Sequence, residues 1–342
     1  MTHTIMIASP LEAEYVELIR DVDSTIEVLY APDLLPPTRY IADHKGVEFS
    51  RAARQQRRWR EMMAAADIMW DLPDREDLAV ATSLKWIQTT STGVGPAVAA
   101  LGLAESEVLI TTARGVHAGP LAEFVFMALL QHWRGLPHLV AEQRAHRWVR
   151  YCGEEVAGRT LVLIGAGDLA RGCARVGRAL EMRVIAVTRD PARARAHGDL
   201  FDALCGPSEL HAALAVADAV VVTVPHTADT EGMIDAAAFA AMRPGVAFVN
   251  IARGHVVDED ALVAGLSTGR IGFAALDVTR HEPLPADSPL WDMANVLISP
   301  HSASTVATEN RKITDIFRHN LRCWIDGEPE RMRNVLDKRL LY

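Results

Sequence analysis

The chain has 342 residues, of which 49% are hydrophobic and 23% are charged, and its formal net charge is -9 at pH 7. This length is too great for one small core, so two domains are expected. The acidic balance argues against a nucleic-acid-binding surface, and we interpret the one basic cluster, residues 51–60, as a solvated helix face. The most apolar stretch, residues 212–225, is too short to span a bilayer.

The first part of the chain alternates short apolar segments with helical patterns. Strands are predicted at residues 4–8, 26–30, 66–70, 86–90 and 108–111. Helices are predicted between them, the first starting near Leu11 and an Arg-rich one preceding the third strand. This alternation predicts a parallel sheet covered by helices. The polar segment 33–59 has no assigned role, and we keep a lid, an interface element and a surface insert as its alternatives.

A long apolar helix is then predicted over residues 120–139, and a second alternating series follows it. Its strands are expected at residues 160–164, 183–188, 219–224, 247–250, 272–276 and 296–299, and the last helix at 307–325. The pattern predicts an α/β protein with two doubly wound domains, the nucleotide-binding type inserted into the middle of the chain. We expect the inserted domain at residues 113–299 and the other at residues 1–112 and 300–342.

The cysteines are scattered, and no two have the C-x-x-C spacing of a zinc or redox motif. This argues against a metal site or a disulfide framework and fits a reducing compartment, so a cytoplasmic location and no metal are expected. No long apolar region opens the chain, so no secretory signal is expected. The positions are Cys152, Cys173, Cys205 and Cys323.

The segment L-V-L-I-G-A-G-D-L-A contains the pattern G-x-G-x-x-A, directly after a predicted strand and at the start of a helix. In this context Gly165 permits a tight turn, Gly167 lets a pyrophosphate approach the backbone, and Ala170 permits close packing of the helix against the strand. The alternative is a glycine-rich turn with no ligand. The expected cofactor contacts in this loop are Gly165, Ala166, Gly167, Asp168 and Leu169.

The end of the second strand of the series decides which dinucleotide is expected. An acidic residue there binds the ribose hydroxyls of NAD. This chain has Thr188 followed by Arg189, and an arginine can hold the 2′-phosphate of NADP, with Arg193 as support. We therefore favour NADP(H). NAD(H) is the alternative, with Arg189 stacked on adenine or Asp190 bent back to the ribose.

Four polar residues follow predicted strands of the second series. Arg253 lies in N-I-A-R-G, Asp277 and Glu282 lie in L-D-V-T-R-H-E-P-L, and His301 lies in S-P-H-S. Ligands of open α/β sheets bind at the carboxyl ends of the strands, so these residues are expected to meet there. His281, the neighbour of Glu282, is interpreted as a surface or rim residue because adjacent side chains on a turn diverge.

These motifs, in this order, resemble the D-isomer-specific 2-hydroxyacid dehydrogenases, the family of glyoxylate/hydroxypyruvate reductases and phosphoglycerate dehydrogenases. The resemblance rests on G-x-G-x-x-A, T-V-P-x-T-x-x-T, N-x-A-R-G, L-D-V-x-x-x-E-P-L and P-H, and it runs from about Gln88 to the C-terminus. Departures are Gly95, Thr188 and Thr279. The resemblance implies a Rossmann nucleotide-binding domain inserted into a flavodoxin-like substrate domain.

By this resemblance, Arg253 binds the substrate carboxylate. Its guanidinium is permanently charged and can donate two parallel hydrogen bonds to that group. His301 acts as the acid that protonates the carbonyl oxygen, and Glu282 orients the imidazole and stabilises its charged form. The backbone at Thr92 and Gly93 is expected to cradle the substrate carboxylate. Further expected cofactor contacts are Val224, Pro225, Thr230, Ile251, Ala252 and Asp277, the last holding the nicotinamide carboxamide.

The resulting prediction is a reductase that converts a small 2-oxo acid into the D-2-hydroxy acid, with glyoxylate or hydroxypyruvate as the preferred type of substrate. A homodimer is expected through the long helix.

The alternative function, from another class of protein, is a non-catalytic NAD(P)-sensing corepressor or scaffold. A formate dehydrogenase is disfavoured because that branch has glutamine where Glu282 stands, whereas a phosphite dehydrogenase stays open. No additional C-terminal regulatory domain is expected.

Overall fold

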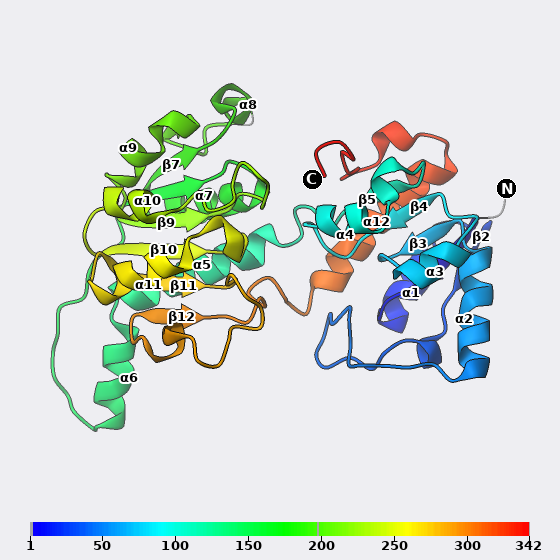
Figure 1. Cartoon of the computed structure of the whole chain (residues 1–342), viewed down its shortest axis with the longest axis horizontal. Helices are drawn as coiled ribbons and strands as arrows, with labels where there is room; N and C mark the ends of the chain where they lie inside the picture. The colour runs from blue at the N-terminus through cyan, green and yellow to red at the C-terminus, as the bar shows by residue number, and fades with distance from the viewer. Residues whose placement is uncertain (1–2, 197, 342) are drawn as a thin grey trace. The chain divides into compact units, whose positions relative to one another are not determined.

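The structure of the protein is a computed structural model that describes residues 3–196 and 198–341. The chain divides into two compact units: unit 1 is Met1–Val116 with Thr305–Tyr342, and unit 2 is His117–Ser304. Each unit is built around one parallel sheet with helices on both faces (Figure 1), as the alternating pattern predicts. In the described part of the chain, no helix has the length and apolar character needed to cross a membrane.

Unit 1 contains a five-stranded sheet in the order β2-β1-β3-β4-β5. All of its neighbouring strands are parallel; Ile5 of β1 pairs with Val28 on one side and with Ile68 on the other. This order is that of flavodoxin-like sheets, as expected. The strands are β1 (His3–Ile7), β2 (Ile26–Leu29), β3 (Ile68–Trp70), β4 (Trp86–Gln88) and β5 (Leu109–Thr111).

The two faces of this sheet have separate hydrophobic cores. One core includes residues of α1 and α12, where Phe317 contacts the rings of Trp70 and Trp86. The other includes residues of α2 and α4, with Trp59 and Met63 fully enclosed or nearly so. The helices of unit 1 are α1 (Ala13–Arg20), α2 (Ala53–Ala65), α3 (Arg75–Val80), α4 (Gly95–Ala100) and α12 (Glu309–Ile325), with 3-10 turns at Pro32–Leu34, Leu103–Glu105 and Pro329–Arg331.

Unit 2 contains a seven-stranded parallel sheet in the order β12-β11-β10-β9-β6-β7-β8. Read from β8, its first six strands have the Rossmann order, and β12 adds a seventh. Every predicted strand of this unit is present, whereas β8 is half-buried, three residues long and was not predicted. The strands are β6 (Thr160–Ile164), β7 (Arg183–Val187), β8 (Ala203–Cys205), β9 (Ala219–Val222), β10 (Val246–Asn250), β11 (Ile271–Leu276) and β12 (Val296–Ile298).

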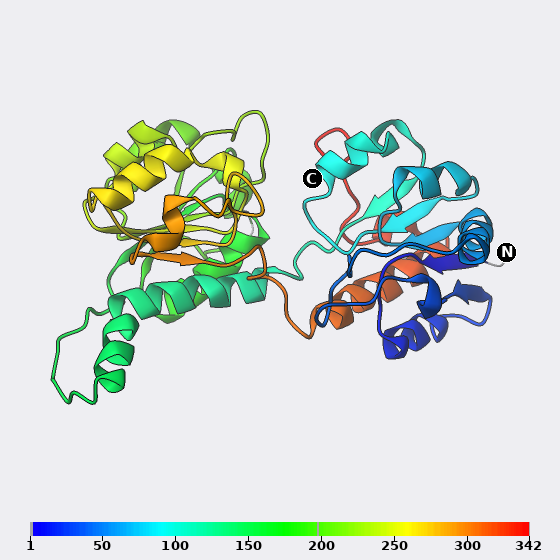
Figure 2. The ribbon, with the colours of Figure 1, turned by 60° about the horizontal axis from the view of Figure 1, so that its bottom comes forward.

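Helices cover both faces of this sheet as well (Figure 2). One core packs α5 and α7 against the strands, and the other packs α9, α10 and α11 against the opposite face. The helices are α5 (Ala118–Trp133), α6 (Leu136–Arg144), α7 (Asp168–Ala179), α8 (Pro191–Arg195), α9 (Leu210–Leu214), α10 (Ala236–Ala241) and α11 (Glu259–Ser267), with 3-10 turns at Pro207–Glu209, Gly254–Val256 and Pro289–Asp292.

The predicted single helix over residues 120–139 is wrong at its C-terminal end. Helix α5 ends at Trp133, and α6 begins three residues later, at Leu136, directly after Gly135. Gly135 has φ +65°, the left-handed conformation in which glycine commonly ends helices, and Pro137 sits near the start of the next helix. The chain therefore turns here, and α6 projects away from the body of unit 2 (Figure 1).

A close contact between α5 and α7 depends on a glycine. A Cβ atom added at Gly172 would lie 2.6 Å from the carbonyl oxygen of Ala118, a distance at which the backbone has to move. We expect Gly172→Ala to lower the free energy of unfolding by about 1–3 kcal/mol, as overpacking does. Urea denaturation followed by circular dichroism measures this change.

The matched control is Gly119→Ala at the start of α5, where an added Cβ would meet no described atom within 4 Å. Alanine favours a helix over glycine by about 0.5–1 kcal/mol, so this variant is expected to be as stable as the parent or more stable. Equal destabilisation by the two substitutions would show that contact between α5 and α7 is not the cause.

Candidate active site

The glycine loop after β6 has the shape that the sequence predicts. Gly165 has φ +116°, and a Cβ there would lie 2.6 Å from the Thr223 hydroxyl, which itself donates to the carbonyl of Ile164 at 2.8 Å. Gly167 is the N-cap of α7, and a Cβ added to it would meet no described atom within 4 Å. The first turn of α7 therefore has open space at its N-terminus, where a helix favours an anion.

Two small residues allow α7 to pack closely, and the sequence predicts one of them, Ala170, for packing against the strands. Ala170 is fully buried against the sheet, but Gly172, two residues later, makes the contact with α5. Sequence reasoning missed Gly172 because it matched only the six-residue pattern and did not consider what covers α7.

Asp190, the acidic residue that follows β7 where the ribose of a dinucleotide is expected, caps the next helix. The carboxylate of Asp190 accepts a hydrogen bond from the Arg193 backbone N–H at 2.8 Å and caps α8. Asp190 is therefore held by its own helix, and the exposed side chain beside it at the strand end is the cation of Arg189.

The loop after β9 is held together by its threonines. The Thr230 hydroxyl donates to the carbonyl of Pro225 at 2.7 Å and accepts from the N–H of Thr227 at 2.8 Å. Thr230 thus shapes the loop that contains Val224 and Pro225. Next to it, His226 pairs with Glu231, which holds the pKa of that carboxyl below its usual range.

Arg253 follows β10 in a turn that Asn250 fixes. The buried amide of Asn250 donates to the Arg253 carbonyl at 3.1 Å and accepts from the Ala252 N–H at 3.0 Å. Gly254 lies directly against the loop after β11, since a Cβ there would be 1.9 Å from the Thr279 carbonyl oxygen. These contacts explain the asparagine and the glycine of N-x-A-R-G. The side chains of Ile251 and Ala252 belong to the cores, so only their backbone is available to a ligand.

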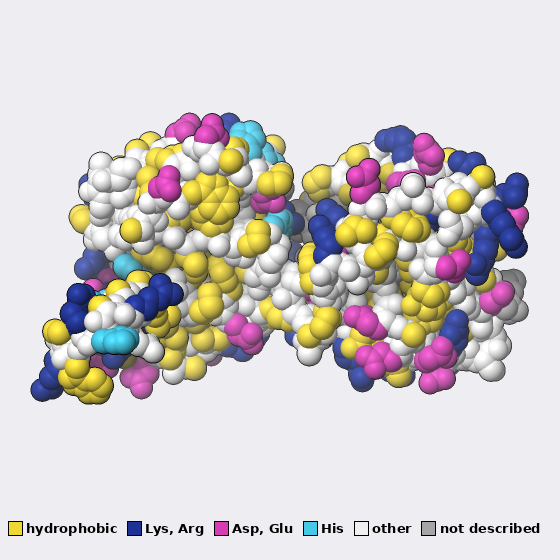
Figure 3. Space-filling view, turned by 90° about the horizontal axis from the view of Figure 1, so that it is seen from below, with side chains coloured by type: hydrophobic (Ala, Val, Ile, Leu, Met, Phe, Trp, Pro, Cys, Tyr) yellow, Lys and Arg dark blue, Asp and Glu magenta, His cyan; other side chains and the backbone are white. Residues whose placement is uncertain are grey.

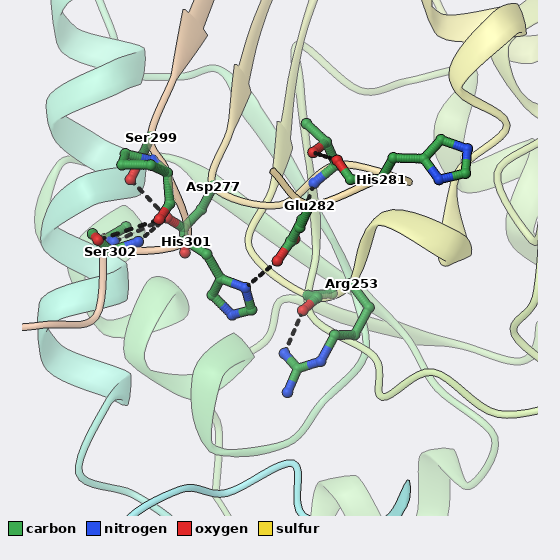
Figure 4. Close-up of polar contacts among 11 residues, drawn as sticks. Arg253, Asp277, His281, Glu282, Ser299, His301 and Ser302 are labelled. Atoms are coloured by element: carbon green, nitrogen blue, oxygen red, sulfur yellow. Dashed lines mark hydrogen bonds and ion pairs between the residues drawn. The ribbon is translucent and has the colours of Figure 1, made fainter. Parts of the chain in front are cut away.

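Asp277 follows β11 and is 3% exposed. One carboxylate oxygen accepts three hydrogen bonds, from the Ser299 hydroxyl at 2.7 Å and from the N–H groups of Ser302 and Ala303 at 2.9 Å each. Its carbonyl accepts from the His301 N–H at 2.9 Å. The structure therefore shows a role for Asp277 that the sequence did not predict: it anchors the loop that carries His301 (Figure 4).

Glu282 and His301 come together although nineteen residues separate them. His301 Nδ1 lies 2.7 Å from one oxygen of Glu282, and the other oxygen accepts from the Thr279 N–H at 3.3 Å. A carboxylate only accepts, so Nδ1 carries the proton. Both side chains are partly exposed: 44% of the His301 side chain and 39% of the Glu282 side chain are accessible to solvent. The side chain of His281 points away from this pair (Figure 4), which agrees with its interpretation as a rim residue.

The backbone of His301 has φ +53°, a left-handed conformation that is costly for a residue with a side chain. The anchor on Asp277 compensates for it, because His301 and the two residues after it all donate to that one residue. The imidazole is held at Nδ1, and no described residue engages Nε2. The arrangement can deliver or take a proton at Nε2, on the side of the loop where Arg253 also lies (Figure 4).

The predicted substrate contacts Thr92 and Gly93 lie in unit 1, in the exposed loop that follows β4. Hydrogen bonds hold this loop at Ser91, whose carbonyl accepts from the Thr89 hydroxyl at 2.8 Å and from the Ala113 N–H at 3.2 Å. Among the described residues, no group of three or more histidine, cysteine or acidic side chains is placed to hold a metal ion.

Comparison with known proteins gives the family. Residues 126–303, just over half of the chain, match the family model described as "D-isomer specific 2-hydroxyacid dehydrogenase, NAD binding domain". The chain belongs to the D-isomer specific 2-hydroxyacid dehydrogenase family. The matched residues include the glycine loop, Arg253, Glu282 and His301.

Relatives within this family have several different substrates in their names. The chain is 36% identical over 220 residues to (S)-sulfolactate dehydrogenase of Chromohalobacter salexigens, covering 64% of this chain and 70% of that one. It is 35% identical over 266 residues to D-3-phosphoglycerate dehydrogenase of Mycobacterium bovis, and this match covers 75% of the chain. It spans about half (48%) of the length of that relative. It is 29% identical to human glyoxylate reductase/hydroxypyruvate reductase, covering 73% and 77% of the two chains.

Solved structures of the family match nearly the whole chain. A D-isomer specific 2-hydroxyacid dehydrogenase family protein from Aeromonas salmonicida superposes with a TM-score of 0.81 at 28% identity, over 99% of this chain and 100% of that one. A second, from Xanthobacter autotrophicus Py2 in complex with NADPH and MES, has a TM-score of 0.78 at 27% identity over all of both chains.

Proposed function

We propose that this family member is an NADPH-dependent reductase that converts a small 2-oxo acid, of the glyoxylate or hydroxypyruvate type, into the D-2-hydroxy acid. The hydrogen bond of 2.7 Å between Glu282 and His301 is the observation that carries the proposal. It prepares a proton donor beside the permanently charged guanidinium of Arg253, at the carboxyl edge of a sheet. The human relative named for glyoxylate and hydroxypyruvate supports the substrate type.

In this proposal each of the three side chains has a separate chemical role. Arg253 binds the substrate carboxylate through two parallel hydrogen bonds and orients the neighbouring carbonyl. His301 donates the proton on Nε2 to the carbonyl oxygen, and Glu282 fixes the ring and balances the positive charge of the imidazolium. When NADPH is bound, its dihydronicotinamide ring supplies the hydride.

The residues after β6 fit a dinucleotide. The open space in front of Gly167, the N-cap of α7, suits a pyrophosphate. Asp277 keeps one carboxylate oxygen that no described residue engages, and that oxygen is suited to accept from a carboxamide. We accordingly assign the dinucleotide to unit 2 and the cradle for the substrate carboxylate, at Thr92 and Gly93, to unit 1.

Two observations support NADP(H) as the cofactor. One carboxylate oxygen of Asp190 caps α8, and the cation of Arg189 is exposed beside it at the end of β7. The similar protein from Xanthobacter autotrophicus Py2 was solved with NADPH. We also propose a cytoplasmic location, which suits the four free cysteines of the chain.

Turnover by His301→Asn is the direct test of the proton donor. With glyoxylate, hydroxypyruvate, pyruvate and phenylpyruvate as substrates, we expect the parent to reduce at least one of them. For His301→Asn we expect kcat to fall by about 10²–10⁴-fold with that substrate, because general acid catalysis contributes on this scale. The Kd of NADPH, measured by fluorescence titration, is expected to stay within about twofold.

His281→Asn is the matched control, since it removes the neighbouring imidazole that points away from the pair. We expect its kcat to equal that of the parent. A His301→Asn variant that keeps its turnover would refute the assignment. If the parent binds NADPH but reduces none of the four 2-oxo acids, the proposed substrate type is wrong, and a nucleotide-sensing scaffold or a phosphite dehydrogenase is the function to test next.

Arg189→Ala tests the cofactor preference. Losing a charge-assisted hydrogen bond to the 2′-phosphate is worth about 1.5–3 kcal/mol, so kcat/KM for NADPH is expected to fall by about 10–100-fold. The value for NADH serves as the internal control and is expected to change little, since NADH lacks this phosphate. A parent enzyme that strongly prefers NADH, or equal losses with both cofactors, would contradict the assignment.

We further propose a homodimer that uses the segment around α6. This segment of unit 2 exposes several large apolar side chains, and apolar surface lies beside it in Figure 3. The exposed fractions are 98% for Trp148, 61% for Val149, 46% for Leu136, 43% for Leu139 and 50% for Met127 of α5. A projecting apolar segment is typical of a surface that a second copy covers.

The solution mass checks this proposal. Sedimentation equilibrium is expected to show two chains for the parent and a weakened dimer for the double variant Trp148→Ser, Val149→Ser. A parent that stays monomeric at concentrations near 100 micromolar, roughly where weak dimers already form, would contradict the proposal.

A further inference from the structure

Residues 333–341 follow α12 and run along one edge of the sheet of unit 1. Strand β5 is the last strand on this side, and Val335 forms an antiparallel bridge with Thr111 of that strand. The N–H of Leu336 donates to the Ile110 carbonyl at 2.8 Å. The segment thereby covers the edge of the sheet. In Figures 1 and 2 it is drawn in red, and it reaches the region where α4 lies.

Polar side chains hold this segment at two points. The amide nitrogen of Asn320, a fully buried residue of α12, donates to the Arg333 carbonyl at 3.0 Å, and its amide oxygen accepts from the Arg333 N–H at 2.7 Å. Five residues later, the ammonium group of Lys338 donates to the carbonyl and the hydroxyl of Ser106, just before β5. The segment is therefore a fixed part of unit 1.

The turn that follows Asp337 lies directly against the start of α4. The N–H of Leu341 donates to the Asp337 carbonyl at 2.7 Å, and Leu341 has φ +60°, a left-handed conformation that is costly for a residue with a side chain. Its side chain packs against the core that contains Val94 and Val98. A Cβ atom added at Gly95, the first residue of α4, would overlap the Leu341 carbonyl oxygen and lie 2.9 Å from the Leu341 Cβ. The two backbones are thus in direct contact, and no side chain fits between them.

This contact fixes one end of the loop between β4 and α4. Thr92 and Gly93, to which we assign the substrate carboxylate, directly precede the start of α4. At the other end of the loop, the Ser91 carbonyl accepts two hydrogen bonds. The loop is therefore held on both sides, and on the side of α4 the contact is with Leu341. Gly95 is also a position at which the sequence departs from the motifs of its family, and the contact explains the glycine.

We propose that residues 337–341 position the loop that receives the substrate carboxylate. Leu341 bears on Gly95 and so sets where the backbone of this loop meets the carboxylate. The inference rests on the proposed function, because it concerns the same cradle. Leu341 is a positioning residue that acts through Gly95. Its removal weakens the binding of the 2-oxo acid, whereas the proton donor and the dinucleotide, both assigned to unit 2, are unaffected.

A cycle of two changes tests this inference by kinetics. The parent, Gly95→Ala, a chain shortened after Asp337 and the shortened chain with Gly95→Ala are compared with one 2-oxo acid and NADPH. Each single change is expected to raise KM for the acid about tenfold, the scale of one hydrogen bond to a charged group, with kcat and the Kd of NADPH within about twofold of the parent. In the shortened chain, Gly95→Ala is expected to raise KM no further, because Leu341 is gone.

Gly119→Ala is the matched control for the added methyl group. It places a Cβ in the first turn of α5, where no described atom lies within 4 Å, and is expected to leave KM unchanged. If the effects of Gly95→Ala and of the shortening multiply, the contact with Leu341 does not set KM. An unchanged KM in the shortened chain, or a fall in kcat in place of the rise in KM, would also overturn the inference.

Hydrogen–deuterium exchange reports on the loop without any substrate. A peptide that covers residues 89–100 is expected to exchange about tenfold faster in Gly95→Ala and in the shortened chain than in the parent, because the loop opens locally. A peptide from β6 is expected to exchange as in the parent, which shows that the variants are folded. Equal exchange of residues 89–100 in the parent and the shortened chain would refute the inference. A parent that reduces no 2-oxo acid would count against the proposed function, and the exchange would still decide whether the segment holds the loop.

Discussion

The buried carboxylate of Asp277 is the group on which the candidate site depends. It gathers donors from Ser299, Ser302 and Ala303, and its carbonyl holds the N–H of His301. A buried carboxylate is tolerated when it is surrounded by donors in this way. The chain after β12 is thereby fixed to the end of β11, with His301 in a left-handed backbone conformation that it would not adopt readily by itself.

A second constraint brings the partner of His301 to the same place. The backbone of Thr279 rests on Gly254, where no side chain fits, and the N–H of Thr279 reaches the carboxylate of Glu282. The loop after β10 and the loop after β11 are therefore packed against each other. This backbone contact therefore links Arg253, whose turn Asn250 fixes, to the loop that contains Glu282.

Much of this arrangement could be predicted because it follows local patterns. The strands of unit 2 are buried apolar runs, and the order of their motifs placed Arg253, Glu282 and His301 at one edge of the sheet. Features that arise from tertiary contacts could not be predicted. The half-buried β8 has no such run, and the anchor on Asp277 joins segments more than twenty residues apart. The break at Gly135 did have a local signal, a glycine two residues before a proline, which the apolar pattern outweighed.

The central claim is that Glu282 and His301 act as one proton-delivering unit, and a double-mutant cycle tests it most directly. The kcat of the parent, Glu282→Gln, His301→Asn and the double variant would be measured with one 2-oxo acid and saturating NADPH. Residues that act as a unit are strongly non-additive, so the double variant is expected to be no more than about threefold slower than His301→Asn alone. If the two losses multiply instead, the two side chains act independently, and Glu282 is not the partner through which His301 delivers its proton.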